Sequence, residues 1–358
     1  MKLLYLGFLI LAVSCTNSTN KKDYNSIINI CRYSQWLKIS ESSEAILIQI
    51  QNPDDTTKKY SLRLPNFNTS ERSGTYTFDE PVQRLVCLSS THIGMMTELD
   101  LRANIVAVSN LKYIYDSQLK STNPMAVGEE QGIDVEKVVK SEAEAIIYSA
   151  FSSSFVKEKV LKKLGIQCIP NFDWREVQPL GRAEWILFYG YLTGQQKQAK
   201  LKFDEICRNY EKIKNSFDSS DSLRTLSGNI TGDFWYAPAG ESYHAQLMRD
   251  AGLSYIFSNE KGTGSLAYSF EKILGISSEI DLWLNPGFKT KQEIIQSYPK
   301  SNMLPILDQS SLFCYTHNSN KYWERSACRP DLVLADYSEL KKGHNIDPKK
   351  LVFYKRVR

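Results

Sequence analysis

Residues 84–110 read RLVCLSSTHIGMMTELDLRANIVAVSN. The stretch begins with a short apolar run, passes through a turn rich in serine and threonine, continues with a helical pattern and ends in a second apolar run. This order predicts a strand, a helix and a strand parallel to the first. Both runs are almost continuously apolar, as expected when helices cover both faces of a parallel sheet.

The same alternation extends in both directions along the chain. VEKVVKSE, AIIYSA, FVKEKVLKKLG and QCIPNF complete a first α/β lobe over residues 81–180. A helical pattern at 181–218, with a bend expected at Thr193-Gly194, precedes a second α/β lobe at 219–358. The fold class is therefore two α/β lobes joined by one long backbone helix. A helix packed on both lobes restricts their hinging and predicts a shallow, preformed cleft suited to a large rigid ligand.

Residues 24–80 differ from the rest, because ILIQI, YSLRL and TYTF are short strand-like runs separated by turn-rich segments. They predict a β-rich N-terminal extension. The pattern assigns no function to it.

The N-terminal residues have the pattern of an export signal. Residues 1–14 combine Lys2, an apolar run over 3–13 and the small Ser14 directly before Cys15, and a polar tether follows over 15–23. This arrangement resembles the lipobox of bacterial lipoproteins. The apolar run is shorter than the ~20 residues that span a bilayer as a helix. We expect lipidation of Cys15, a periplasmic location and a lipid anchor to a bacterial membrane.

Composition excludes some functions. The 44 basic and 40 acidic residues nearly balance and are scattered, whereas a nucleic-acid-binding protein needs a concentrated basic stripe. The four histidines are dispersed and form no metal motif, so we expect no resident metal or cofactor. We also expect the protein to be a monomer. Cys87 and Cys168 lie in apolar runs, which predicts that they are buried free thiols. Cys314 and Cys328 are close in sequence, but the sequence does not decide whether they form a disulfide.

Four stretches resemble one family. They are residues 84–110, GIDVEKVVKSEAEAIIYS at 132–149, QPLGRAEWILFYGYLTG at 178–194 and ERSACRPDLVLADY at 324–337. In this order they resemble the helix-backboned periplasmic substrate-binding proteins of iron-siderophore, haem and cobalamin ABC importers. The resemblance covers about three-quarters of the chain and implies capture of a chelate and its delivery to an ABC permease with its ATPase.

Ligands of such folds lie outside the carboxyl ends of the strands. Aromatic side chains at loop tips there suggest a ligand-facing wall, and Arg175 offers a guanidinium to an anionic chelate. The candidate ligand-binding residues are Tyr113, Tyr115, Phe151, Trp174, Arg175, Trp235, Tyr236 and Tyr268.

The resemblance also implies one exposed glutamate on each lobe that pairs with arginines of the permease. Glu158 and Glu241 are the candidates, because each precedes or begins a helix next to a cleft loop. The helix dipole alone also favours a carboxylate at these positions.

Two other functional classes stay open. A periplasmic enzyme that processes such a chelate needs a titratable pair in the cleft, and neither a GxSxG motif nor a Walker lysine is present. An adhesion or scaffold protein would use the β-rich extension as its contact face.

Overall fold

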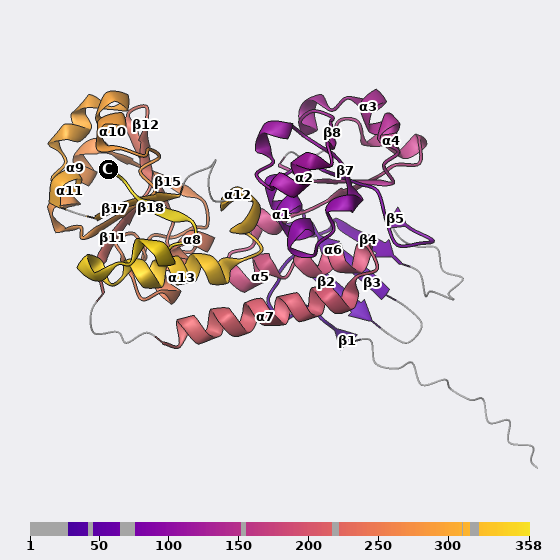
Figure 1. The fold of residues 1–358 in the computed structure, drawn as a ribbon, viewed down its shortest axis with the longest axis horizontal. Coiled ribbons are helices and arrows are strands. Elements are labelled where there is room, and N and C mark those ends of the chain that lie inside the picture. Colours follow the sequence, from indigo (N-terminus) through magenta and orange to yellow (C-terminus); the bar gives the residue numbers. More distant parts are fainter. Residues whose placement is uncertain are drawn as a thin grey trace, which may run out of the picture.

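The computed structural model describes residues 28–41, 46–64, 76–151, 155–216, 222–309, 311–315 and 322–358. The expected signal at 1–14, Cys15 and the tether lie outside these residues. Figure 1 shows two α/β lobes side by side, with helix α7 (Gln196–Lys214) running beneath them. None of the helices in the described ranges combines the length and apolarity needed to cross a membrane.

The first lobe is a parallel five-stranded sheet in the order β10-β9-β6-β7-β8. The central strands β6 and β9 are buried along their whole length, which confirms the expectation from their apolar runs. The strands are β6 (Leu85–Cys87), β7 (Ile105–Val108), β8 (Met125–Ala126), β9 (Ala145–Tyr148) and β10 (Gln167–Pro170). The helices are α1 (Ser90–Glu98), α2 (Ser117–Ser121), α3 (Val135–Lys140) and α4 (Glu158–Lys163).

The second lobe has a five-stranded sheet in the order β14-β11-β16-β17-β18, in which only the edge strand β18 is antiparallel. A small antiparallel sheet, β12-β13-β15, stands beside it. The strands are β11 (Arg224–Ser227), β12 (Asn229–Thr231), β13 (Phe234–Pro238), β14 (Ser254–Tyr255), β15 (Ser265–Ser269), β16 (Leu282–Leu284), β17 (Ser311–Tyr315) and β18 (Tyr354–Arg356). The helices are α8 (Tyr243–Asp250), α9 (Phe270–Ile276), α10 (Lys291–Ser297), α11 (Ile306–Gln309), α12 (Tyr322–Arg325) and α13 (Pro330–Leu340).

The helical segment between the lobes consists of three helices, α5 (Pro179–Ala183), α6 (Ile186–Leu192) and α7. The sequence pattern predicts one long helix bent at Thr193-Gly194, but the chain is divided there into α6 and α7, because Gly194 has a φ of +78°, which a helix does not tolerate. One face of α7 is buried at helical spacing through Ala199, Phe203, Ile206 and Tyr210. This helix contacts α6 on the first-lobe side and α13 of the second lobe, so it is packed against both.

The β-rich extension forms a five-stranded sheet in the order β1-β2-β3-β4-β5. Its strands are β1 (Ile28–Asn29), β2 (Leu37–Glu41), β3 (Ile46–Gln51), β4 (Lys59–Arg63) and β5 (Tyr76–Thr77). Alternate side chains of β2 and β3 are buried, which places one face of this sheet in the core.

Two buried carboxylates fasten the extension to the rest of the chain. Glu184 accepts hydrogen bonds from the backbone N–H groups of Arg32, Tyr33 and Ser34 at 2.7–2.8 Å. Glu176 accepts from the backbone N–H of Gln35 at 3.0 Å and from the Ser34 hydroxyl. Burial raises the pKa of both carboxyls. Five donors on one short turn therefore hold the extension against the segment that joins the lobes.

The six cysteines from Cys31 to Cys328 are all free and buried. The expectation for Cys87 and Cys168 is confirmed, and burial raises the pKa of both thiols to about 12. Cys314 and Cys328, whose pairing the sequence does not decide, are both free thiols.

Candidate ligand-binding cleft

The two lobes meet where α1 of the first lobe packs on α12 of the second. A Cβ built on Gly94 of α1 would lie only 1.5 Å from the carbonyl oxygen of Glu324, so only glycine fits there. The Glu324 carboxylate accepts hydrogen bonds from the backbone N–H groups of Tyr115 and Asp116 in the first lobe. Because both backbone and side-chain atoms take part, this α1–α12 contact fixes the lobes at a defined spacing.

Ion pairs surround the α1–α12 contact. Glu98 of α1 pairs with Arg325 at 2.9 Å and with Arg329 at 3.3 Å. Arg329 also pairs with Asp331 at 2.7 Å, and both of these side chains are buried. These two arginines thus join the lobes and are engaged by carboxylates of the protein itself.

A second link between the lobes runs through Arg182 of α5. Its guanidinium pairs with the buried Asp173 at 3.0 Å and lies 5.1 Å from the centre of the Tyr243 ring on α8. The Thr91 hydroxyl, at the start of α1, donates to the same Asp173 carboxylate. Arg182 therefore places a positive charge between the first-lobe loops and the second lobe.

A cavity of about 350 Å³ opens at the carboxyl ends of β11, β16 and β17, where the fold places ligands. Three strands, α8 and α12 supply its walls. The lining residues are Ser227, Gly228, Asn229, Pro238, His244, Asn285, Gly287, Cys314, Tyr315 and Trp323.

Two polar atoms of the lining are buried without a hydrogen-bond partner among the described residues, Nδ1 of His244 and Oδ1 of Asn285. Burial, followed by the nearby charge of Arg182, lowers the pKa of His244 to about 4. Asn285 has a φ of +64°, a left-handed conformation that asparagine tolerates better than most residues. His244 therefore lines the cavity as a neutral imidazole, a group that can accept a hydrogen bond or ligate a metal.

Aromatic rings form the remaining wall. Tyr315 stacks on Tyr322, with ring centres 3.8 Å apart and planes 3° apart. Trp323 stands edge-on to Tyr315 at 5.4 Å and is 39% exposed. Such a partly exposed indole, held by two rings behind it, can stack on a flat ligand.

Three of the candidate ligand-binding residues of the first lobe lie close together. Trp174 donates its indole N–H to the carbonyl of Ser149 at 2.7 Å and lies 5.0 Å from the ring of Phe151, which is 69% exposed. Arg175 lies over the Trp174 ring at 5.1 Å, but it pairs with Asp54 of the β-rich extension at 2.5 Å. Phe151, Trp174 and Arg175 thus form one cluster at the ends of β9 and β10.

Tyr113 and Tyr115 follow β7, as expected. Tyr113 is 38% exposed, and the Lys112 ammonium lies 4.6 Å from its ring centre. The backbone of Tyr115 belongs to the α1–α12 contact. Both residues lie on the first lobe close to the interface between the lobes.

The expected loop position of Trp235 is wrong. Trp235 lies in β13, is 1% exposed, packs on Trp283 at 5.0 Å and donates its indole N–H to the Ser227 carbonyl. Because β13 pairs with β15, the segment continues as a strand and buries alternate side chains.

The other two second-lobe candidates also miss the cavity. Tyr268 lies directly opposite Trp235 in the ladder and stacks on Phe257 at 4.2 Å. Tyr236 is 40% exposed and points to the opposite face from Trp235. Neither residue belongs to the cavity lining.

The two candidate docking glutamates lie on different lobes. Glu158 is the first residue of α4 and is partly exposed. Glu241 is exposed, precedes the N-cap Ser242 of α8 and accepts a hydrogen bond from the backbone N–H of Gly262 at 2.9 Å.

Sequence reasoning missed His244, Asn285, Tyr315 and Trp323. The rule that selects residues after parallel strands would have found two of them, because Asn285 ends DLWLN and Tyr315 ends SLFCY. His244 and Trp323 lie on helices, so no strand-end rule points to them.

The model of a family described as periplasmic binding protein matches residues 85–305. An uncharacterized lipoprotein of Methanocaldococcus jannaschii is 22% identical over 273 residues, and the match spans 73% of this chain and 65% of the relative.

Two solved structures share the fold. A possible iron-binding periplasmic solute-binding protein of Staphylococcus epidermidis aligns with a TM-score of 0.56 and 16% identity, covering 74% of this chain and 99% of its own. A periplasmic haem-binding protein of Vibrio cholerae aligns with a TM-score of 0.58 and 12% identity, covering 73% and 98%. At these identities the likeness concerns the fold alone.

Proposed function

Since the chain belongs to the periplasmic binding protein family, we propose that it is the substrate-binding protein of an ABC importer. It captures a bulky iron chelate, such as a ferric siderophore or haem, or cobalamin, and delivers it to the permease. The observation that carries this proposal is the cavity at the carboxyl ends of the second-lobe strands, which His244, Asn285 and the partly exposed Trp323 line together.

The chemistry of the cavity suits a metal chelate. A neutral His244 offers a lone pair to a metal centre or to a donor group of the ligand at physiological pH, because its pKa is lowered to about 4. Trp323 offers an apolar face to a flat ring system. The similar structures from S. epidermidis and V. cholerae, a possible iron-binding protein and a haem-binding protein, agree with a ligand of this kind.

The first lobe supplies the opposite wall of the proposed site. Phe151 and Trp174 are the side chains we assign to it, together with Tyr113 and Tyr115 near the interface between the lobes. Arg175 is proposed to orient Trp174, because it lies over that ring and is already paired with Asp54.

The proposed cleft is preformed. The α1–α12 contact and α7 both join the lobes, so closing on a ligand needs little rearrangement. A rigid site loses less conformational entropy on binding, and this favours a rigid chelate over a flexible peptide.

Anchoring and delivery complete the proposal. Lipidation of Cys15 holds the protein at the membrane on the periplasmic side, in keeping with the lipoprotein name of the M. jannaschii relative. Glu158 and Glu241, one on each lobe, dock on the permease. The family match favours transport over the enzyme and adhesion alternatives.

The test is a titration of the purified protein with haem, cobalamin and ferric siderophores, followed by absorption spectroscopy. We expect one of these ligand classes to bind and His244→Ala to weaken it by about tenfold or more, as for loss of a buried polar contact. The exposed His344 provides the matched control, and His344→Ala leaves affinity unchanged. Failure of all three ligand classes to bind contradicts the proposal.

A further inference from the structure

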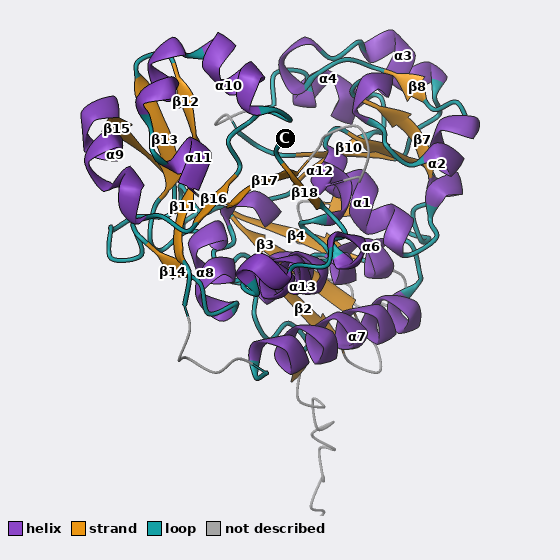
Figure 2. Cartoon of the chain, turned by 60° about the vertical axis from the view of Figure 1, so that its left-hand side comes forward, coloured by secondary structure: helices purple, strands orange, loops and turns teal. Residues whose placement is uncertain are grey.

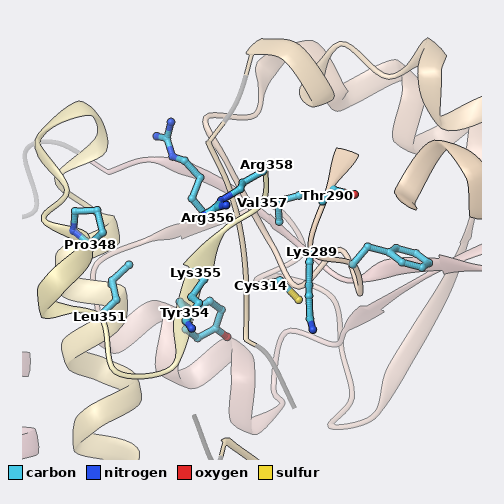
Figure 3. A pocket seen from close by; sticks show the side chains of 11 residues that line it. Lys289, Thr290, Cys314, Pro348, Leu351, Tyr354, Lys355, Arg356, Val357 and Arg358 are labelled. Carbon is cyan, nitrogen blue, oxygen red and sulfur yellow. The ribbon is translucent and has the colours of Figure 1, made fainter. Parts of the chain in front are cut away.

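The second lobe contains another, larger cavity. Its volume is about 790 Å³, more than twice that of the cavity at the strand ends, and the two share Cys314 alone. The segment after β16, the turn at Pro348–Lys350 and strands β17 and β18 enclose it (Figure 3). Figure 2 shows the C-terminal strand β18 next to β17. Tyr315, at the end of β17, lines the smaller cavity.

The lining of this cavity is basic. Its residues are Phe288, Lys289, Thr290, Cys314, Pro348, Leu351, Tyr354, Lys355, Arg356, Val357 and Arg358. Four of them have cationic side chains and none has an acidic one, so the side chains of the lining favour an anion.

The strand register shows which cations face the cavity. Lys355 lies directly opposite Cys314, and Arg356 lies opposite Phe313. Side chains opposite one another share a face of the sheet, so Lys355 is on the Cys314 face and Arg356 on the other. The guanidinium of Arg356 confirms this, since it lies 5.6 Å from the Phe313 ring centre and donates to the Ser311 hydroxyl.

Lys289 is the second cation on the Cys314 face. In Figure 3 its side chain runs down beside the Cys314 thiol. Lys289 is exposed and forms no ion pair with a carboxylate in the described part of the chain, whereas its neighbour Lys291 pairs with Asp308 at 3.5 Å. Lys289 and Lys355 therefore place two ammonium groups around one apolar strand position.

Apolar side chains complete the wall. Phe288 and Leu351 are partly buried, and Val357 is 5% exposed. A ligand held by two lysines and by these side chains must carry both a negative group and an apolar body. Lysine binds phosphate as a compact point charge and does not need the paired geometry of arginine.

We propose that this cavity, with Lys289 and Lys355 as the cationic contacts, binds a phosphate monoester that carries an apolar or aromatic group. The site is distinct from the proposed chelate site and does not depend on it. The phosphate is held at the Lys289–Lys355 side of the cavity, and the apolar group lies against Phe288 and Leu351. A lipid phosphate and a phosphorylated soluble metabolite share this chemistry.

Calorimetric titration of the purified full-length chain tests the proposal with three probes. 1-Naphthyl phosphate has both features, 1-naphthol has the ring alone and inorganic phosphate has the charge alone. We expect 1-naphthyl phosphate to bind about tenfold or more tightly than either half, and its affinity to fall as salt is raised. Equal binding of 1-naphthol and 1-naphthyl phosphate overturns the proposal, as does the absence of binding.

Variants locate the site. Lys289→Gln and Lys355→Gln should each weaken 1-naphthyl phosphate by about fivefold to tenfold. Lys291→Gln, which removes a neighbouring lysine outside the lining, is the matched control and should have no effect. Unchanged affinity in both lining variants refutes the assignment. His244→Ala leaves this affinity intact, so failure of the chelate proposal and failure of this one are separable.

Competition identifies the source of the phosphate. Displacement of 1-naphthyl phosphate by short-chain phosphatidic acid assigns the site to lipid, and displacement by riboflavin 5′-phosphate, a soluble phosphate monoester with an aromatic ring system, assigns it to soluble metabolites. Displacement by neither overturns a natural phosphate ligand.

Discussion

Replacing Gly94 by alanine tests the contact that spaces the lobes. Gly94 lies in the middle of α1, where alanine alone would favour the helix by about 1 kcal/mol. Here the added methyl would lie 1.5 Å from the Glu324 carbonyl oxygen, which is backbone and does not rotate aside. The two helices must therefore separate.

The magnitude follows from what the separation breaks. Overpacking of a tight contact costs about 1–3 kcal/mol. Moving α12 also strains the hydrogen bonds from Tyr115 and Asp116 to the buried Glu324 carboxylate, and bonds to charged groups are worth about 1.5–3 kcal/mol each. After the gain in helix propensity, we expect Gly94→Ala to lower the free energy of unfolding by about 2–4 kcal/mol.

Denaturant unfolding followed by circular dichroism measures this change. Gly275→Ala is the matched control, because Gly275 also lies in a helix, α9, and a Cβ there meets nothing within 4 Å. We expect the control to be as stable as the native chain or more stable by up to about 1 kcal/mol. If Gly94→Ala is equally stable, α12 does not press on α1 as the structure indicates and the lobes are not locked at this point.

Four further predictions concern residues outside the contact between Gly94 and Glu324. Cys15→Ser should move the protein from the membrane fraction to the soluble fraction after signal processing, and retention in membranes would disprove the lipid anchor. Trp235→Ala should lower the free energy of unfolding by about 3–5 kcal/mol, because it empties a core position against a second tryptophan, and a denaturation curve like that of the native chain would contradict this. Burial lowers the pKa of His92 to about 4, so between pH 6.5 and 4 the unfolded chain binds a proton that the folded chain does not, and stability should fall on acidification by up to about 3 kcal/mol. His92→Gln should reduce this fall when unfolding is measured at pH 7 and 4.5, and an unchanged pH dependence would rule out His92 as its source. Glu158→Arg combined with Glu241→Arg should abolish uptake in reconstituted vesicles without changing ligand affinity, and normal uptake would remove both residues from the docking surface.

The two-lobe α/β architecture could be predicted from local pattern. Apolar runs such as LVCL and AIIY alternate with helical segments, and this order is typical of parallel strands covered by helices on both faces. Local pattern also indicates the buried thiols Cys87 and Cys168 and an irregularity at Gly194, although it predicts a bend there and the structure has a full break. The rule that ligands lie at strand ends also selected Phe151 and Trp174, which the structure brings together.

Which side chains face the cleft depends on packing between segments that are distant in the sequence. Trp235 and Tyr236 are neighbours in one strand, yet one is buried and the other exposed, because a strand alternates its faces and the partner sheet, not the sequence, selects the buried one. The contact between Glu324 and Tyr115 joins residues 209 positions apart, and no local pattern encodes such a pair. The lowered pKa of His244 also depends on tertiary structure, because the segments that bury it and the Arg182 charge near it come from distant parts of the sequence.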